Sequence, residues 1–307
     1  MTGTYKRSTS FIYRNARPLD LARWQYHFEN GSRDTVVNAL SHYQNEDGGF
    51  GHAVEADCFD PHSSPIQTWC ATEILHEIGF TDGESPMIQG ILRYLSSGDS
   101  FSVKHNQWRD VASTANDYPR ACWWNYTSDD EGQWQYNPTA CLVGFVLRYA
   151  DTNSELYRKC REIAQEAYSY FVKSVPIGDE HVTSCFLRMY EYCTEAGVDF
   201  LDMNLFREKI IEQVNFTIVR DTSRWATEYV PLPSRFIESK ESIFLPGNEQ
   251  AVAEECRHIV EKQEADGSYP VTWQWWNDYK EYMLAANWWK ADFVIKNMRF
   301  LKNFGEI

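Results

Sequence analysis

The feature that most constrains the fold of this chain is a seven-residue motif that occurs twice. Residues 44–50 (Gln-Asn-Glu-Asp-Gly-Gly-Phe) and 263–269 (Gln-Glu-Ala-Asp-Gly-Ser-Tyr) both read Gln-x-x-Asp-Gly-small-aromatic. Each copy is predicted to end a helix, with Gly48 and Gly267 in the left-handed backbone conformation that stops it. The preceding apolar residues fall at helical spacing: Val36, Val37, Leu40 and Tyr43 before the first copy, and Val252, Cys256, Ile259 and Val260 before the second.

A second pattern marks where helices begin. Ser64-Pro65 and Asn137-Pro138 each place a capping oxygen before a proline, which is predicted to stand at the first helical position because its missing N–H costs nothing there. About ten helices and no strand are expected in total. Further amphipathic helices are predicted at about 18–30, 84–97, 153–174, 181–196, 203–219 and 280–303, the last broken near Asn287.

The connections alternate between short turns and four long loops, at 45–63, 98–136, 220–246 and 264–279. Stacked helical hairpins of this kind bury a continuous core between neighbouring repeats. We therefore predict an all-α fold, an α/α-toroid of repeated helical hairpins that forms a single domain over residues 1–307. The long loops are expected to gather at one end, around the mouth of a central cavity.

Composition limits where in the cell the protein is expected and which classes of partner it is expected to bind. The chain has 29 Lys+Arg against 44 Asp+Glu, a formal charge of −15, which repels nucleic acid and anionic lipid. No apolar stretch approaches the roughly 20 residues that a transmembrane helix needs, and the N-terminus lacks a signal-peptide core. The eight cysteines include no Cys-x-x-Cys pair. We predict a cytoplasmic protein with no transmembrane segment, nucleic-acid partner, cofactor or metal.

Aromatic residues are concentrated in the long loops. They make up 15% of the chain, and aromatic side chains outside a core often line a ligand site. Trp123 and Trp124, which precede the acidic run at 129–131, are predicted to bind a ligand. Trp273, Trp275 and Trp276 form a second candidate group, with alternation placing the first two on one side. The alternative is that these rings pack between hairpins and that the acidic run is a solvated turn.

The densest polar cluster follows the first motif. If the segment is extended, Glu55 and Asp57 point to the same side, near His52, and one carboxyl beside aromatic walls is a candidate general acid. Glu228 is the candidate partner carboxylate across the cavity. We expect His52, Glu55 and Asp57 to line the same cavity as Trp123 and Trp124. The alternative is that Glu55 or Asp57 caps the helix at Ser64 or tethers the loop.

The motif at 44–50 resembles the repeat of protein prenyltransferase β subunits and squalene or terpenoid cyclases. The strings at 50–57 (Phe-Gly-His-Ala-Val-Glu-Ala-Asp), 122–124 (Cys-Trp-Trp) and 137–139 (Asn-Pro-Thr) also resemble a group of bacterial proteins of unassigned function. The resemblance spans most of the chain as a pattern, although only the two Gln motifs are specific. It implies the α/α-toroid fold and a bacterial branch of that superfamily.

The catalytic motifs of these families are not carried over. Class II cyclases use Asp-x-Asp-Asp, which residues 55–57 and 129–131 do not match. Class I terpene synthases use Asp-Asp-x-x-Asp, and in this chain Gln133 stands where the third acid of that motif should be. Protein prenyltransferases hold zinc with Asp, Cys and His, but Asp57 and Cys58 beside His52 or His62 have no standard ligand spacing. The helical α partner of prenyltransferases is also not encoded in this chain.

Two classes of function remain. One is an enzyme that acts on an isoprenoid-like or other largely apolar substrate, as the resemblance implies. The alternative is a carbohydrate-active enzyme, a glycosidase or lyase, or a non-catalytic module that binds a ligand or protein. A glycosidase needs two carboxylates roughly 5–10 Å apart, so Glu228 or Asp129 would join Glu55 or Asp57. In every case the expected ligand is a small molecule or oligosaccharide in the central cavity, and no protein partner is specified.

Overall fold

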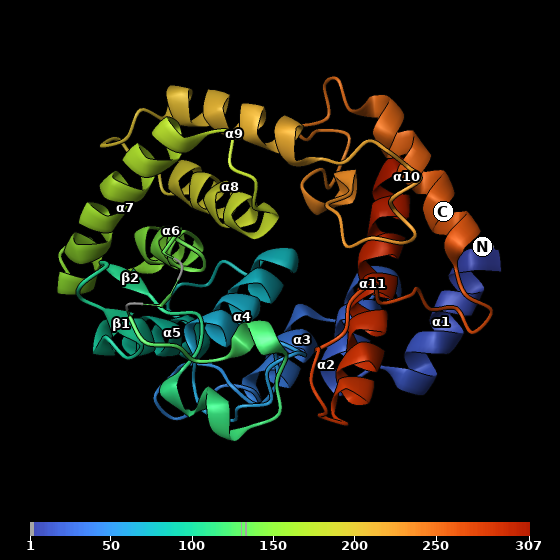
Figure 1. The fold of residues 1–307 in the computed structure, drawn as a ribbon, viewed down its shortest axis with the longest axis horizontal. Helices are drawn as coiled ribbons and strands as arrows, with labels where there is room; N and C mark the ends of the chain where they lie inside the picture. Colours follow the sequence, from blue (N-terminus) through green and yellow to red (C-terminus); the bar gives the residue numbers. More distant parts are fainter. Residues whose placement is uncertain (1–2, 130, 133) are drawn as a thin grey trace. The chain divides into compact units, whose positions relative to one another are not determined.

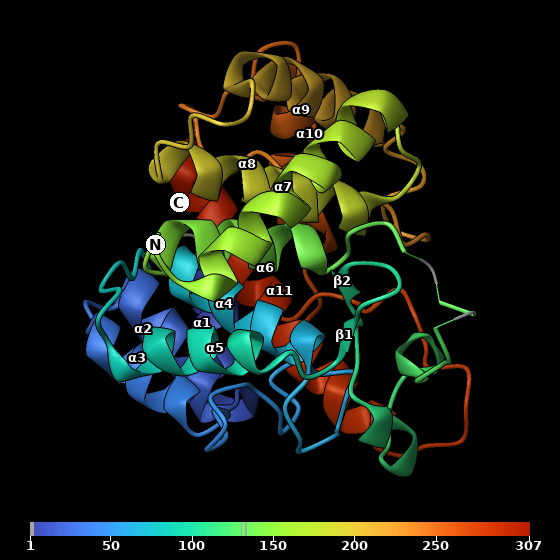
Figure 2. The ribbon, with the colours of Figure 1, turned by 90° about the vertical axis from the view of Figure 1, so that its left-hand side faces the viewer.

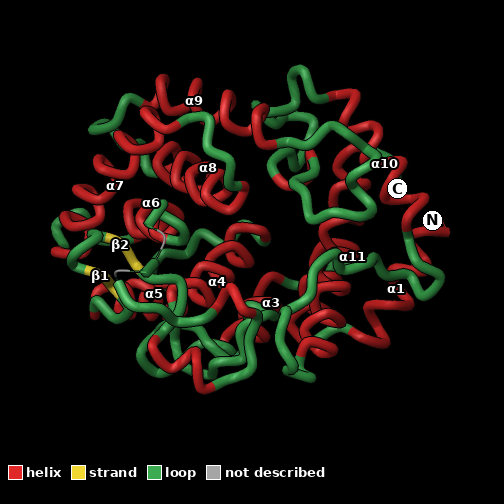
Figure 3. Tube along the Cα trace, in the orientation of Figure 1, coloured by secondary structure: helices red, strands yellow, loops and turns green. Residues whose placement is uncertain are grey.

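The structure, a computed structural model, describes residues 3–129, 131–132 and 134–307. Eleven α-helices and one small sheet lie within these residues, so the all-α prediction is confirmed (Figure 3). The helices are α1 (Gly3–Asn15), α2 (Pro18–Phe28), α3 (Arg33–Ser41), α4 (Pro65–Glu77), α5 (Pro86–Ser97), α6 (Thr139–Tyr149), α7 (Glu155–Ser174), α8 (Glu180–Glu195), α9 (Met203–Thr217), α10 (Glu249–Lys262) and α11 (Tyr282–Phe304).

Strands and 3₁₀ turns occupy small parts of the long loops. Strand β1 (Phe101–Ser102) pairs antiparallel with β2 (Gln107–Trp108), with Phe101 opposite Trp108. No strand was predicted, and two residues per strand are too few to show an alternating pattern in the sequence. The 3₁₀ helices are η1 (Ser113–Asp117), η2 (Cys122–Trp124) and η3 (Pro233–Arg235).

The chain divides into two compact units. The central unit is Ser41–Thr217, and the terminal unit combines Met1–Leu40 with Ile218–Ile307. The toroid and the single domain stay predictions. Among the described helices, none is long and apolar enough to cross a membrane.

In the central unit, α6 and α8 pack along each other, and α7 and α9 lie outside them (Figures 1 and 2). Helix α6 is buried from Thr139 to Leu147, as expected for a helix enclosed on all sides. A Cβ atom on Gly144 would lie 2.9 Å from the Cα atom of Met189, so a glycine is needed where the two helices meet. Phe171 and Phe186 stack at 4.5 Å and fix α7 on α8.

In the terminal unit, α11 packs against α1, α2 and α10 (Figure 1). A buried ion-pair network joins α2 to α11, because the guanidinium of Arg23 donates to Asp20 at 3.1 Å and to Asp292 at 2.9 Å. The two ends of the sequence therefore share one core.

The predicted helix starts are confirmed at Ser64, whose hydroxyl accepts the N–H of Gln67, but the equivalent prediction at Asn137 is wrong. Helix α6 begins at Thr139, and Pro138 occupies the cap position without a side-chain cap. The Asn137 side chain is engaged elsewhere, because its Oδ1 accepts the Cys185 thiol.

Two more helix predictions need correction. Helix α1 was not predicted, because only four of its residues are buried and two of these are polar. Helix α11 continues through Asn287, since the Asn287 side chain donates to the carbonyl of Asn15 on α1 instead of interrupting its own helix. In both cases a tertiary contact outweighs the local sequence signal.

The two motifs form the same turn, which we call the Gln turn (residues 44–50 and 263–269). Gly48 has a φ of 96° and Gly267 a φ of 97°, so the predicted left-handed conformation is confirmed. The prediction that these glycines stop the helices is wrong, because α3 ends at Ser41 and α10 at Lys262. The side-chain amide of Gln44 donates to the carbonyls of Gly48 and of Met87 on α5. That of Gln263 donates to the carbonyl of Gly267 and, on α1, to Thr4 O and Ser8 Oγ. Each Gln turn is thus fastened to a neighbouring helix.

Candidate functional site

The loop at 51–63 joins the first Gln turn to α4 and does not run as an extended segment. His52 and Ala53 both have a φ of 58°, and the following residues form turns, so the expected extended geometry is wrong. Glu55 and Asp57 are buried, and the Glu55 carboxylate accepts the backbone N–H of Asp57 at 2.9 Å. This contact is the one expected if Glu55 tethers its own loop.

A cavity of about 590 Å³ opens beside the first Gln turn in the central unit. It is bounded by this turn, by the end of the loop at 51–63, by Asp99 and by the segment 112–114. His52 lines it, whereas Glu55, Asp57, Trp123 and Trp124 do not. The lining residues are Asn45, Glu46, Asp47, His52, Pro61, His62, Ser63, Asp99, Ala112, Ser113 and Thr114.

Hydrogen bonds organise one wall of the cavity. The side chain of Asn45 donates to Pro61 O and to Ser63 Oγ, both at 3.0 Å, and His52 Nε2 lies 2.9 Å from Asn45 Oδ1. Ser63 Oγ in turn donates to Asp47 Oδ1 at 2.7 Å. The Ser63 hydroxyl is therefore held between the turn's own side chains.

An aspartate–histidine pair stands at the rim. Asp60 is buried, and its Oδ1 lies 2.8 Å from His62 Nδ1 and accepts the His62 backbone N–H at 2.9 Å. Its Oδ2 accepts the hydroxyl of Thr114 at 2.6 Å. Because an ionised carboxylate only accepts hydrogen bonds, Asp60 favours the tautomer with the proton on Nδ1. The other ring nitrogen, Nε2, has no hydrogen-bond partner among the described residues and belongs to a side chain that is 55% exposed.

The two loop tryptophans differ in their surroundings. Trp123 is 42% exposed, whereas Trp124 packs against the buried cluster of Cys58, Ile66, Val111 and Ala115. The loop at 51–63 contacts the segment before them, since Asp57 O accepts the N–H of Ala121. The two longest loops of the central unit are therefore in contact with each other. Asp130 and Gln133 of the predicted acidic segment lie outside the described residues.

The remaining predicted residues belong to the terminal unit. Glu228 is exposed and pairs with Arg224, four residues earlier in the chain, at 2.8 Å. Trp273 makes edge contacts with Trp289 and Phe293 on α11. Trp275 is buried against Tyr282, and Trp276, next in the chain, is 75% exposed with a φ of 56°.

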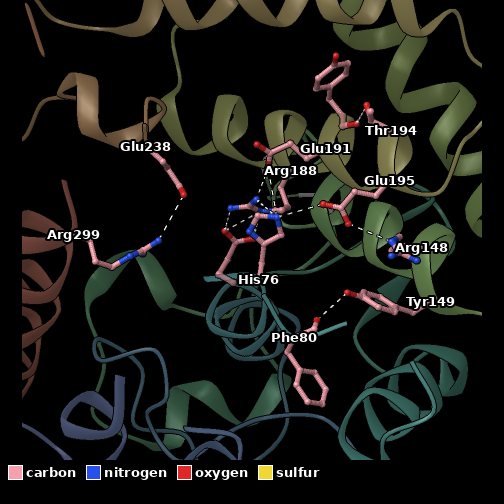
Figure 4. Close-up of polar contacts among 12 residues, drawn as sticks. His76, Phe80, Arg148, Tyr149, Arg188, Glu191, Thr194, Glu195, Glu238 and Arg299 are labelled. Carbon is pink, nitrogen blue, oxygen red and sulfur yellow. Dashed lines mark hydrogen bonds and ion pairs between the residues drawn. The ribbon is translucent and has the colours of Figure 1, made fainter. Parts of the chain in front are cut away.

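A charged network on the helices of the central unit was missed by the sequence reasoning (Figure 4). Arg188 on α8 is buried and binds both oxygens of Glu73 on α4, and it also contacts Glu191 and His76. Glu195 continues the chain of contacts to Arg148 on α6 at 3.2 Å. Since opposite charges alternate along it, the network ties α4, α6 and α8 together. These residues lie three and four positions apart on their helices, which is also the spacing of ordinary surface pairs, so the sequence does not single them out.

Asp60 and His62 were also not predicted as a pair. Their separation by one proline is the only local signal in the sequence. The pair can be recognised only in the folded protein, where Thr114 of the other long loop donates a hydrogen bond to Asp60. Within the described residues, no group of three His, Cys, Asp or Glu side chains has the arrangement of a metal site. Comparisons with protein-family models, with curated proteins and with solved structures found no match.

Proposed function

We propose that the chain forms an α/α-toroid of the terpenoid cyclase and protein prenyltransferase type. The support is the way the second Gln turn is used. The first Gln turn docks on α5, which follows it in the chain, whereas the second docks on α1, at the other end of the sequence. In a ring of repeats the last hairpin must meet the first helix in this way.

We further propose that the cavity of the central unit binds a neutral, hydroxylated small molecule, and that a carbohydrate is the ligand class. Nine of its eleven lining residues carry hydrogen-bonding side chains. Glu46, Asp47 and Asp99 contribute negative charge, which disfavours the diphosphate group of an activated isoprenoid. The hydrogen-bonding side chains and the negative charge of the lining together support the carbohydrate alternative.

The observation that carries this proposal is the Asp60–His62 pair. With Nδ1 held by a buried carboxylate, His62 Nε2 is available to accept a proton from a substrate hydroxyl or from a water molecule. Asp60 then stabilises the imidazolium that forms, and Thr114 keeps the Asp60 carboxylate in place. Activation of a water molecule by proton transfer is a step of glycoside hydrolysis.

The test compares His62→Gln with His42→Gln, a matched change at an exposed histidine at the end of α3. Melting temperature and calorimetric affinity are measured with maltotriose, cellotriose, chitotriose and mannotriose, and with farnesyl diphosphate as the isoprenoid probe. We expect at least one sugar to bind to the wild type and to His42→Gln, with affinity or turnover lost in His62→Gln. Binding of farnesyl diphosphate alone, or equal sugar affinity and equal turnover in both variants, contradicts the proposal.

The other predicted catalytic residues keep the status of proposals. His52 faces the cavity and is the one of them that reaches a ligand there directly. Glu55→Gln and Asp57→Asn are expected to lower the melting temperature, because both side chains are buried. Loss of sugar affinity at an unchanged melting temperature would instead assign Glu55 or Asp57 to the binding machinery.

A further inference from the structure

Asp110 lies between β2 and η1, two residues before the segment that lines the cavity. Its carbonyl accepts the N–H of Ile66 at 2.8 Å, which places it at the first turn of α4. Its half-buried carboxyl group has no hydrogen-bond partner among the described residues. Burial, with a smaller contribution from the charge of Asp179, raises the pKa of Asp110 to about 7.

Asp179 provides a contrast to Asp110. It stands at the start of α8, where its carboxylate accepts the N–H groups of His181 and Val182 at 2.8 and 3.1 Å. The helix backbone thus uses the hydrogen-bonding capacity of Asp179. That of Asp110 remains available for a ligand.

Three aromatic side chains pack against the hydrophobic cluster that adjoins Asp110. Trp69 on α4, Trp124 of η2 and Tyr126 are each partly buried and pack against the cluster that contains Ile66 and Val111. These two residues are the hydrogen-bond partner and the chain neighbour of Asp110. Partly exposed rings of this kind offer the flat faces on which the C–H groups of a sugar stack.

Two of these rings carry buried donors without acceptors. The indole N–H groups of Trp69 and Trp124 are enclosed and have no hydrogen-bond partner among the described residues. A buried unsatisfied donor costs about 1–3 kcal/mol, so such groups in a native fold call for a partner that binds there. Sugar hydroxyl oxygens are acceptors of the required kind.

We propose that Trp69, Trp124 and Tyr126 form a sugar-binding subsite in which the Asp110 carboxyl group hydrogen-bonds a sugar hydroxyl. The segment 110–114 links the subsite to the cavity lining, and we expect one oligosaccharide to reach both. The class of ligand rests on the proposed function; the location rests on the unpartnered donors and on Asp110.

The test follows the affinity of the same four sugars for Trp124→Leu and Asp110→Asn. The matched controls are Trp276→Leu, at an exposed indole of the terminal unit, and Asp117→Asn, at an exposed carboxylate of the same loop. We expect affinity to fall at least tenfold in Trp124→Leu and by a smaller factor in Asp110→Asn, with both controls unchanged. In the wild type, the indole N–H resonances of Trp69 and Trp124 should shift on sugar addition, and that of Trp276 should not.

The outcomes separate the two proposals. Sugar binding that is lost in His62→Gln but retained in Trp124→Leu, with no indole shift, overturns the subsite and leaves the proposed function standing. Binding that is lost in Trp124→Leu but retained in His62→Gln supports the subsite and overturns the role of His62. If none of the four sugars binds to the wild type, both proposals are wrong. The indole shifts keep the test decisive even if Trp124→Leu does not fold.

Discussion

In the second Gln turn, the hydroxyl of Ser268 donates to Asp266 and to Glu264, each at 2.7 Å. In the first, Gly49 stands in the position of Ser268. The hydroxyl there comes from Ser63, which donates to Asp47 at 2.7 Å. A Cβ atom on Gly49 would lie 2.5 Å from the Ser63 Cβ atom, so Ser63 occupies the place that a side chain at position 49 would fill.

This comparison separates structural groups from candidates for function. Asn45, Asp47 and Ser63 have counterparts in the second turn, so we assign them to the turn itself. His52, Asp60, His62 and Thr114 have none. His52, His62 and Thr114 line the cavity. Asp60 holds His62 and Thr114 in place from behind them. A serine hydroxyl next to a histidine invites a nucleophilic role, but the repeat shows that Ser63 performs the task of Ser268.

The largest loss of stability is expected when either glycine shared by the two turns, Gly48 or Gly267, is replaced by alanine. A Cβ atom on Gly48 would lie 2.1 Å from Gly90 O, and one on Gly267 would lie 2.1 Å from Arg7 O. Backbone strain and overpacking together should cost about 2–4 kcal/mol in each variant, measured by chemical denaturation. Gly98→Ala is the matched control, because its φ is 75° but no atom lies within 4 Å. Equal losses at Gly48 and Gly98 would show that the turn is not docked on α5.

A smaller effect is expected in the pH dependence of stability, from one carboxyl group in each unit, Glu255 and Asp110. Burial raises the pKa of Glu255 on α10 to about 7, against the hydrogen bonds it accepts from Ser234. Because this folded pKa lies above the unfolded one, stability is lost as the pH rises from about 4 through about 7, by up to about 3 kcal/mol. Glu255→Gln should remove this loss. It should therefore gain stability relative to the wild type at pH 8 but not at pH 4.

Asp110→Asn should show the same sign, because burial also raises the pKa of Asp110 to about 7. Melting curves of the wild type and both variants across pH 4–8 make the comparison. A wild type whose stability rises with pH over this range, with the rise abolished in Glu255→Gln, contradicts the assigned direction of the Glu255 pKa.

The smallest predicted effect tests the equivalence of the two hydroxyls. Ser63→Ala and Ser268→Ala each remove one hydrogen bond to the turn's aspartate and should each cost about 1 kcal/mol. Similar losses in chemical denaturation support a shared structural role. If Ser63→Ala keeps its stability and instead loses turnover of a bound sugar, Ser63 belongs to the catalytic machinery and the comparison fails.

The sequence was sufficient for the features that depend on local signals. Ser64 with Pro65, and the glycines of the Gln turns, fix backbone conformations by their own chemistry, and these predictions are confirmed. The helix start at Asn137 was wrong because a thiol from α8 takes the side chain that would have capped it. Local signals do not report such competition.

The site was less predictable because its geometry is tertiary. His52 lines a cavity that does not include Trp123 or Trp124, and the turns at 52–57 direct Glu55 and Asp57 into the interior. Asp60 and His62 acquire their arrangement from Thr114, which lies more than fifty residues further along the chain. No periodicity in the sequence encodes such a contact.

Histidine NMR tests the central claim most directly, namely that the first Gln turn carries a ligand cavity. Protein with labelled histidine rings is titrated with the tightest-binding sugar of the panel. His52 and His62 line the cavity, and His258, which packs on Trp225 in the terminal unit, is the internal reference. We predict that the ring signals of His52 and His62 shift and saturate together while that of His258 stays in place. Saturable binding that leaves His52 and His62 unmoved would contradict the account.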